Sequence, residues 1–569
     1  MITKNIKNKL SIFCVGCGFV AALTACSDVL ETSSNLVEYE KNNQLNQPVD
    51  SFYSVMGIVN KMQIIADRTM LLGEIRSDLV SPTDAASSDL KNLANFDLSE
   101  ANKYNQVADY YAVINNCNYF LAHVDTAMQR RGRKLFLNEF AAVKGFRAWT
   151  YLELIKAYGN VPFITEPLMT ERAADEAMHK APSSIEDICQ YFINDITPYA
   201  DAVMPDYGEV GGHQSSKFFI PMKALLGDLC LWSGRYLEAA RWYNAYLNDK
   251  KNPIQFQPSR SRWTNVSNFN SPSRGYSIDN SELLSFIPME EGIFYGTISD
   301  IKNVYSSTYE NNYFYQMEPS RALRDLSKSQ VNCVKYMAES ATTVDTVIVD
   351  PSLIDDEIKV GDLRLYSLYS MSTSGTQDKY SEYSSKRQTI SKFFDNRIAT
   401  YRRAMVYLRY AEALNRAGFP QSAMTILKYG ICPDNISIYV DSLEQVAASD
   451  YIQFDPNIFT RERAMGVHSN GSGDSDINPF YVLPQPEDSL ATRQDTINYQ
   501  IPLVEDLIVN EMALEGMFEG YRFYDLMRVA LRRGDASYLA NPVSRRNGVV
   551  DERLRALLMD KKNWYLPLP

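Results

Sequence analysis

The stretch KGFRAWTYLELIKAYGNVPFITEPL, from Lys144 to Leu168, combines a helical pattern with an abrupt stop. Apolar residues recur every three or four positions over Asn138–Tyr158, which is the pattern of an amphipathic helix. Gly159 is the residue type that commonly follows a helix, and Pro162 prevents the helix from resuming. The stretch therefore predicts a helix that ends at Tyr158 and is followed by a short apolar segment.

Two further stretches have the layout of helix pairs. Met222–Leu247 shows a helical pattern on each side of a turn at Gly234, and Tyr407–Ile431 repeats this layout around Gly418. Small residues inside both stretches make each of them similar to a tetratricopeptide-type hairpin. The sequence therefore predicts a mainly α fold, with a tetratricopeptide-like helical repeat scaffold.

Long insertions separate these helical segments, so the repeats follow no fixed period. Residues 250–400 and 433–500 are rich in Ser, Asn, Asp, Gly and Tyr, and Thr346–Asp350 (TVIVD) predicts a short strand. Loops of this length in a compact protein are commonly functional or disordered, and their aromatic content argues against simple disorder. We predict a single domain over residues 51–569, with irregular loop insertions and a few short strands.

The first residues have the pattern of a secretory signal. Three lysines precede Leu10–Leu23, a mostly apolar stretch that is too short to span a bilayer and suits the core of a signal peptide. The sequence LTAC at residues 23–26 resembles a bacterial lipobox. This resemblance implies that residues 1–25 are removed and that Cys26 is diacylated, which would anchor the chain to a membrane. The alternative is a plain secretory signal with an incidental cysteine.

Residues 26–50 are polar and predict a flexible tether behind the lipid anchor. Asp28 and Glu31, just after the cysteine, resemble the surface-export signal of Bacteroidota lipoproteins. The resemblance implies a lipid-anchored protein of the outer membrane that faces the cell exterior. In other Gram-negative bacteria an Asp after the lipidated cysteine indicates retention in the inner membrane instead, so the inference depends on the lineage.

The overall charge argues against a nucleic-acid partner. The net charge is -12 and the isoelectric point is about 5.1, whereas nucleic-acid binding requires clustered Lys and Arg. The densest basic stretch, RRGRK at Arg130–Lys134, stands alone, and we interpret it as the solvated end of a helix.

The cysteines predict neither a disulfide framework nor a zinc site. Five remain after Cys26; they are scattered and form no C-x-x-C pair. We expect most of them to be small buried side chains.

The sequence gives little support for catalysis. Its four histidines show no H-E-x-x-H spacing, and the chain contains neither a G-x-S-x-G motif nor a P-loop. A glycosidase carboxylate pair is defined by three-dimensional spacing, so it stays open at this stage. The oxygen-rich stretch Asn470–Asn478 could bind Ca²⁺ but fits no EF-hand register, so we interpret it as a solvated loop and predict no cofactor.

Five segments, in order along the chain, resemble the SusD/RagB family of Bacteroidota outer-membrane lipoproteins. The opening stretch has the family's R-A-x-x-Y-x-x-L core and G-x-V-P exit. The other four segments are SSIEDICQYFINDITPYADAVMP (183–205), RRAMVYLRYAEALNRAG (402–418), NEMALEGMFEGYRFYDLMR (510–528) and NWYLPLP (563–569). The departures are Met512 and Gly516, where the family usually has Arg and Leu, and the absence of a tryptophan near Tyr104.

The resemblance implies a SusD-like helical scaffold with a variable face built from loops. It also implies a partner, a SusC-like TonB-dependent outer-membrane barrel, to which the protein delivers a captured glycan or peptide. Arg147, Trp149 and Tyr158 of the opening stretch are then expected to be packing residues. Glu511, Glu515 and Glu519 could form a carboxylate cluster, but their spacing on one helix face and the nearby Arg522 favour structural ion pairs.

The candidate ligand-binding residues lie mainly in one loop. Seven of the twenty-four residues of Ile293–Gln316 are aromatic, against 12% for the whole chain. Aromatic rings can stack on the flat faces of sugars, and Asn, Asp and Arg can bond the hydroxyl groups. The candidates are Trp263, Tyr295, Tyr305, Tyr309, Asn311, Asn312, Tyr313 and Tyr315, with Arg76, Asp78 and Tyr104 as weaker ones. Any of these tyrosines could instead pack the loop against the scaffold.

Four functions remain open from the sequence. The first is a surface glycan-binding lipoprotein of a nutrient importer, and the second is capture of oligopeptides on the same scaffold. Tyrosine-rich loops favour the first only modestly, because tyrosine also binds peptides well. The third is a surface hydrolase, and the fourth is a structural adaptor that uses helical repeats for protein contacts.

Overall fold

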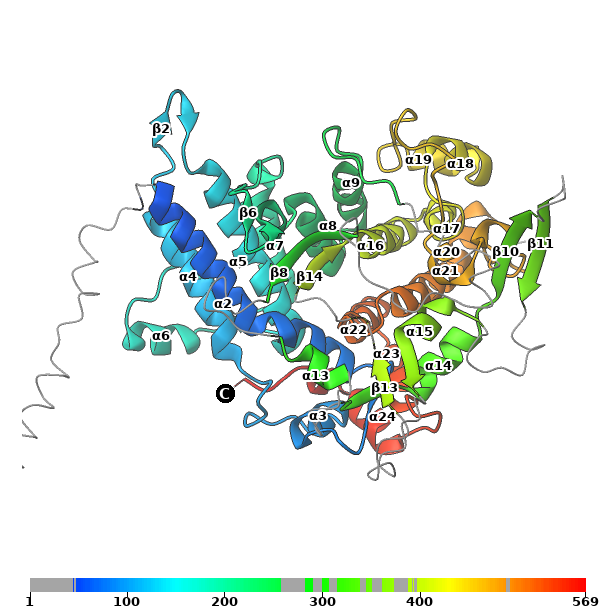
Figure 1. Ribbon diagram of the computed structural model, residues 1–569, viewed down its shortest axis with the longest axis horizontal. Coiled ribbons are helices and arrows are strands. Elements are labelled where there is room, and N and C mark those ends of the chain that lie inside the picture. The colour runs from blue at the N-terminus through cyan, green and yellow to red at the C-terminus, as the bar shows by residue number, and fades with distance from the viewer. Residues whose placement is uncertain are drawn as a thin grey trace, which may run out of the picture.

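Helices make up most of the described chain (Figure 1). The computed structural model describes residues 45, 48–256, 282–289, 299–305, 315–337, 344–349, 361–372, 387–390, 392, 397–487 and 492–568. The main helices of the N-terminal half are α2 (Pro48–Ile75), α4 (Val107–His123), α5 (Leu137–Tyr158), α7 (Ile185–Ile196), α8 (Met222–Trp232) and α9 (Tyr236–Leu247). Each of these helices packs against the next one in this order.

Helix α5 confirms the prediction made from the opening stretch. It ends at Tyr158, and Gly159 follows with a φ of 72°, a conformation that glycine adopts without steric cost. Every residue from Ala141 to Tyr158 is buried, because α2, α4, α7 and α8 all contact this helix. The helix is therefore central to the scaffold.

Helices α8 and α9 form the first predicted hairpin. Gly234 makes the turn between them with a φ of 76°. At Gly227 a Cβ atom would come within 2.4 Å of the Tyr243 ring, so only glycine allows the two helices to pack this closely. The tetratricopeptide-type pattern of Met222–Leu247 is confirmed as a helix pair.

The C-terminal half contains the second predicted hairpin. It is formed by α16 (Arg403–Arg416) and α17 (Pro420–Lys428), with a turn at Gly418. Helix α16 contacts α9 on one side and α17 and α21 (Arg493–Glu515) on the others, so it joins the two halves of the scaffold. Helix α22 (Arg522–Arg533) packs against α21 and α2.

The strands are short and occur only as antiparallel pairs within the described residues. Strand β11 contains most of the predicted TVIVD strand, and its partner is β10. The pairs are β1 (Val80–Pro82) with β9 (Met317–Pro319), β2 (Gln129–Arg130) with β3 (Arg133–Lys134), β4 (Val161–Pro162) with β5 (Pro182–Ser183), β6 (Glu209–Val210) with β7 (His213–Gln214), β8 (Leu283–Pro288) with β14 (Arg397–Arg402), β10 (Asn332–Met337) with β11 (Val344–Val349), and β12 (Tyr369–Ser372) with β13 (Arg387–Ile390).

Shorter helices complete the fold around these elements. They are α3 (Ser88–Ala94), α6 (Glu171–Met178), α13 (Ile301–Tyr305), α14 (Arg321–Lys328), α15 (Leu363–Leu368), α18 (Pro433–Tyr439), α19 (Ser442–Ala447), α20 (Ser469–Ser472), α23 (Ser537–Ser544) and α24 (Glu552–Leu558), with 3₁₀ turns at Thr197–Tyr199, Ser215–Phe218, Ser475–Ile477 and Lys561–Trp564. The predicted mainly α scaffold with a few short strands is thus confirmed.

The basic stretch Arg130–Lys134 is a β-hairpin and not a helix end, so that interpretation was wrong. Strands β2 and β3 pair antiparallel, with Arg130 opposite Arg133. Arg131 and Gly132 form the turn, with φ values of 54° and 75°. Positive φ at both central residues is typical of a two-residue turn whose twist matches that of the strands.

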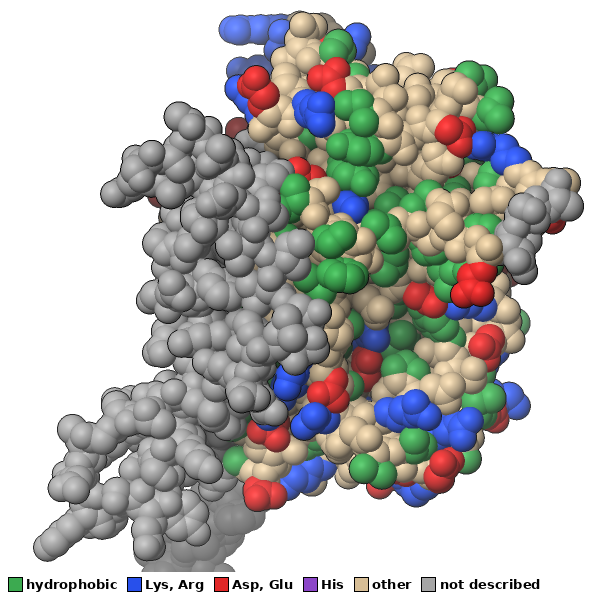
Figure 2. Space-filling view, turned by 90° about the vertical axis from the view of Figure 1, so that its right-hand side faces the viewer, with side chains coloured by type: hydrophobic (Ala, Val, Ile, Leu, Met, Phe, Trp, Pro, Cys, Tyr) green, Lys and Arg blue, Asp and Glu red, His purple; other side chains and the backbone are tan. Residues whose placement is uncertain are grey.

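Buried hydrophobic side chains from both halves form one core cluster. The five cysteines of the described residues are free and buried, as expected: Cys117, Cys189, Cys230, Cys333 and Cys432. Among the described helices, none has the length and apolar character needed to cross a membrane. On the face shown in Figure 2, acidic and basic side chains lie next to one another over the lower half.

Candidate ligand-binding face

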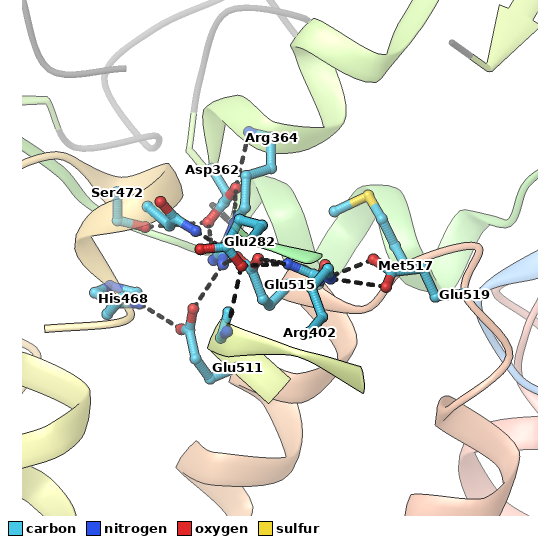
Figure 3. Close-up of polar contacts among 12 residues, drawn as sticks. Glu282, Asp362, Arg364, Arg402, His468, Ser472, Glu511, Glu515, Met517 and Glu519 are labelled. Carbon is cyan, nitrogen blue, oxygen red and sulfur yellow. Dashed lines mark hydrogen bonds and ion pairs between the residues drawn. The ribbon is translucent and has the colours of Figure 1, made fainter. Parts of the chain in front are cut away.

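A buried network of charges surrounds the glutamates of α21 (Figure 3). Arg402, at the end of β14, contacts Glu515 through Nη1 at 2.6 Å and Glu519 through Nη2 at 2.8 Å. Arg364 of α15 contacts both Glu511 and Glu515 through Nη1 at 2.8 Å. All five side chains are at most 2% exposed. The predicted structural ion pairs of the three glutamates are confirmed, but their predicted place on one helix face is wrong for Glu519, because α21 ends at Glu515 and Glu519 lies in the turn that follows.

This network ties the long insertion to the scaffold. Arg364 and Arg402 lie within and just after residues 250–400, whereas Glu515 lies on α21. Burial raises the pKa of Glu515, but the two guanidinium groups outweigh burial and hold that pKa well below its usual range. The carboxylate therefore stays ionised, and the ion pairs persist over the physiological pH range.

The oxygen-rich stretch Asn470–Asn478 belongs to the same network and is not a solvated loop, which corrects that interpretation. Its residues through Ser475 are buried, and the Asn470 side-chain amide donates to Glu515 Oε2 at 2.9 Å. At Gly471 a Cβ atom would lie 2.1 Å from Asp362 Oδ1, so the chain approaches that carboxylate too closely for any other residue. The described residues contain no group of three or more His, Cys, Asp or Glu side chains that could hold a metal ion.

Arg76 and Asp78 have structural contacts instead of the predicted surface position. The side chain of Arg76 is buried and donates hydrogen bonds to the Trp564 carbonyl at 2.7 Å and to the Tyr524 hydroxyl at 3.1 Å. Asp78 is also buried and accepts two hydrogen bonds from Arg522, at 2.7 and 2.8 Å. Neither side chain is placed to meet a ligand, and Arg522 pairs with Asp78 rather than with the glutamates of α21.

The C-terminal segment that Arg76 contacts closes over the ends of α2 and α5. Besides the bond from Arg76 to Trp564, the Leu566 N–H group donates to the Ala157 carbonyl at 2.9 Å. The side-chain amide of Asn105 donates to the carbonyl of the next residue of the tail at 3.1 Å. Because these contacts come from three separate parts of the chain, the tail is held in one position.

An open cleft of about 640 Å³ lies between this tail, the end of α5 and the loop after α3. Tyr565 contributes a half-buried ring, which rests on Gly159, where a Cβ atom would come within 3.1 Å of the ring. The Tyr158 hydroxyl is buried and has no hydrogen-bond partner among the described residues. The lining residues are Phe96, Asp97, Leu98, Tyr158, Asn160, Lys561, Lys562, Asn563, Tyr565, Leu566, Pro567 and Leu568.

The lining of this cleft suits a sugar. Tyr565 offers an aromatic face for stacking, while exposed Asn160, Lys561 and Lys562 offer donors that can reach hydroxyl or carboxylate groups. The sequence did not point to this cleft, because residues 158 and 565 are brought together only by the fold.

The described part of the predicted aromatic loop is mostly interior. Tyr305 is 1% exposed, and its ring lies 5.7 Å from that of Phe518, so it is a core residue and not a stacking platform. Tyr315 is half-buried, and its carbonyl accepts a hydrogen bond from Thr83 Oγ1 at 2.6 Å. Tyr104, the weaker candidate outside this loop, is also buried, at 8% exposed. The remaining candidates lie outside the described residues: Trp263, Tyr295, Tyr309, Asn311, Asn312 and Tyr313.

The structure brings the early loop and the ends of the aromatic loop together. Strand β1 pairs with β9, so residues 80–82 lie beside residues 317–319. On α2, Asp67 accepts hydrogen bonds from the Ser299 hydroxyl and the Asp300 N–H group, both at 2.7 Å. Burial raises the pKa of Asp67 to about 6, although these bonds oppose the rise. The scaffold therefore holds the two described ends of this loop.

The amino-acid sequence matches no protein-family model and no curated protein. The structure, in contrast, is similar to solved structures. A SusD superfamily protein from Bacteroides vulgatus superposes with a TM-score of 0.56 at 15% identity, over 92% of this chain and 96% of that chain. A SusD superfamily protein from Bacteroides thetaiotaomicron superposes with a TM-score of 0.52 at 15% identity, over 84% of this chain and 88% of that chain.

A SusD-like carbohydrate-binding protein from Bacteroides fragilis is also similar. Its TM-score is 0.52 at 14% identity, and the match covers 86% of this chain and 88% of that chain. At this level of identity the likeness establishes the fold. The scaffold, its helical hairpins and its short strand pairs therefore correspond to the SusD-like architecture that the sequence resemblance implied.

Proposed function

Because the protein has the SusD-like fold, we propose that it is a cell-surface lipoprotein that binds a nutrient glycan and delivers it to a SusC-like TonB-dependent barrel in the outer membrane. The observation that carries the proposal is the likeness to a SusD-like carbohydrate-binding protein over most of both chains. Fold alone does not fix function, and the cleft provides a second observation in favour of a sugar ligand.

The cleft beside the C-terminal tail supports a sugar ligand. It has room for more than one sugar ring at about 640 Å³, and it combines aromatic, amide and ammonium groups. Tyr565 would stack on a ring face, and Asn160 would bond the hydroxyl rim. The protein would act by binding and handing over its ligand, without chemical change.

The membrane position of the protein rests on Cys26. We propose that the chain is cleaved before this residue, acylated on it and exported to the outer surface of the outer membrane, as the lipobox-like LTAC and the following acidic residues suggest. Growth with a labelled fatty acid tests this step. Label should enter the protein and should be absent from a Cys26→Ala variant.

Calorimetric titration of residues 27–569 against glycans and oligopeptides tests the ligand. This segment contains every residue that the structure describes. We expect glycan binding that Tyr565→Ala weakens at least about fivefold, taking as a guide the roughly 1–3 kcal/mol that stacking on an aromatic side chain contributes for a nucleic-acid base. Trp263→Ala and Tyr313→Ala test the predicted loop in the same assay.

Tyr53→Ala is the matched control, because Tyr53 is 68% exposed and lies near the N-terminal end of α2, away from the cleft. If the protein binds only peptides, its function is the capture of oligopeptides and not of glycans. Release of shorter sugars from the glycan would show a hydrolase and overturn the proposal.

A further inference from the structure

The β2–β3 hairpin is an isolated basic surface on an acidic protein. Arg130, Arg131, Arg133 and Lys134 are all exposed, while the chain carries a net charge of -12. None of the four forms an ion pair with a residue in the described part of the chain. Most arginines of the helical scaffold, in contrast, have carboxylate partners.

The sequence of the hairpin works against its local stability. Arg130 lies directly opposite Arg133, and like charges in facing positions of a strand pair repel each other. Arg131 has a φ of 54°, a conformation that favours Gly, Asn or Asp over a long side chain. A hairpin selected only to connect α4 and α5 would not need these residues, so the cations point to a role outside the fold.

The hairpin lies at the end of the molecule from which the lipid anchor would extend. It projects beyond the helices beside the first turns of α2 (Figure 1). Leu45 forms a parallel bridge with Val124, the residue just after α4. The 19 Cα–Cα steps from Cys26 to Leu45 can reach at most about 65 Å. A lipid on Cys26 would therefore keep this end of the protein close to the membrane surface.

The base of the hairpin is firmly held, so its cations are presented in a fixed direction. The two strands join α4 and α5, which pack against each other in the scaffold. The Asp125 carboxylate accepts hydrogen bonds from the N–H groups of Ala127 and Met128, at 2.8 and 3.2 Å, so it is engaged in the turn that leads into β2. Leu135 continues the pairing through its bond to the Met128 carbonyl at 2.9 Å.

We propose that the β2–β3 hairpin docks on an anionic membrane surface and contacts the phosphate groups of lipid heads. Arginine matches phosphate in geometry as well as in charge. Acidic residues elsewhere on the protein would oppose this contact little, because screening limits surface charges to about 8 Å at physiological salt. The proposal rests on the membrane anchoring of the proposed function, and the hairpin would set the orientation of the anchored protein.

Vesicle sedimentation tests the proposal with residues 27–569, which lack the lipid. We expect binding to vesicles of phosphatidylcholine and phosphatidylglycerol in equal parts, no binding to pure phosphatidylcholine, and loss of binding at high salt. The combined variant Arg130→Gln, Arg131→Gln, Arg133→Gln, Lys134→Gln should bind the mixed vesicles at least about tenfold more weakly, because each basic residue near an anionic surface adds to the attraction.

A matched variant removes four other exposed cations: Lys180→Gln, Lys250→Gln, Lys251→Gln and Arg553→Gln. It has the same net charge as the hairpin variant and should bind like the wild type. Equal weakening in both variants, or no binding of the wild type to the mixed vesicles, overturns the proposal. The latter result is also the one expected if the hairpin contacts an acidic protein instead. Failure of acylation at Cys26 is seen separately, as absence of fatty-acid label.

Discussion

The arginines around α21 and the arginines of the β2–β3 hairpin place the same side chain in opposite settings. Arg364 and Arg402 are buried, and each has at least two carboxylate partners. Arg130 and Arg133 are exposed, face each other and have no acidic partner among the described residues. A paired arginine in the interior holds distant segments in place, whereas an unpaired one on a projecting hairpin is available to a partner.

The difference also predicts how each region responds to substitution. Removing one member of a buried ion pair leaves a charge without a partner in a medium that solvates it poorly. Removing an exposed cation disturbs little except the long-range field. Four substitutions, in decreasing order of the change that we expect, test this comparison.

Arg402→Met should destabilise the protein most, by about 3–5 kcal/mol, because it leaves Glu515 and Glu519 buried with fewer cationic partners. Denaturant unfolding measures this effect. Arg553→Met, on the exposed side of α24, is the control and should change the free energy of unfolding by less than about 0.5 kcal/mol. Similar effects of both substitutions would show that the network adds nothing beyond a surface charge.

Arg76→Met should destabilise the protein by about 2 kcal/mol, since it removes the donor to the Trp564 carbonyl while keeping an apolar side chain near the Phe523 ring. Hydrogen exchange locates the effect. The Leu566 amide should exchange faster than in the wild type, and the glycan binding that we propose for the cleft should weaken as well. Unchanged exchange at Leu566 would mean that Arg76 does not hold the tail.

Glu74→Gln tests a carboxylate that has the opposite shift to Glu515. Burial raises the pKa of Glu74 to about 7, despite hydrogen bonds from the N–H groups of Phe518 and Gly520. A raised folded-state pKa means that stability from this group is present below about pH 4.5 and is lost as the pH rises through about 7.

Glutamine mimics the protonated form and does not ionise. The free energy of unfolding of the variant, relative to that of the wild type, should therefore rise by up to about 2 kcal/mol from pH 5 to pH 8. Urea unfolding of both proteins at pH 5 and at pH 8 measures this change. A variant that becomes more stable relative to the wild type as the pH falls would contradict the raised pKa of Glu74.

Arg131→Asn should have the smallest effect, a stabilisation of about 0.5 kcal/mol, because asparagine accepts the positive φ of the turn. Thermal unfolding measures this effect. Arg545→Asn, at an exposed arginine outside the hairpin, is the control. Destabilisation at position 131 would show that the arginine contributes to the hairpin itself.

Much of the scaffold could be predicted from the sequence because its signals are local. The end of α5 at Gly159 and the turns at Gly234 and Gly418 depend on residues that are close in the chain. The i, i+4 spacing of Glu511 and Glu515 likewise placed these two on one side of a helix, whereas Glu519, predicted on the same face, lies in the turn after α21.

The candidate site was less predictable because its members come from distant parts of the chain. Arg76 and Asp78 looked like surface residues of an early loop, yet their partners are Trp564, Tyr524 and Arg522. Tyr305 was predicted to stack on a ligand, but its ring packs against Phe518, which is more than 200 residues away in the sequence. The basic hairpin was misinterpreted because two-residue strands are too short to show an alternating pattern.

The bond between Arg76 and the Trp564 carbonyl has a consequence for how the protein is made. It joins residues 488 positions apart, so the first long helix cannot complete its contacts until nearly the whole chain has been synthesised. We expect this delay to suit the export that we propose, since late closure keeps a chain unfolded for longer. A product truncated before Trp564 would lack the acceptor for a buried guanidinium and would be an early target for proteolysis.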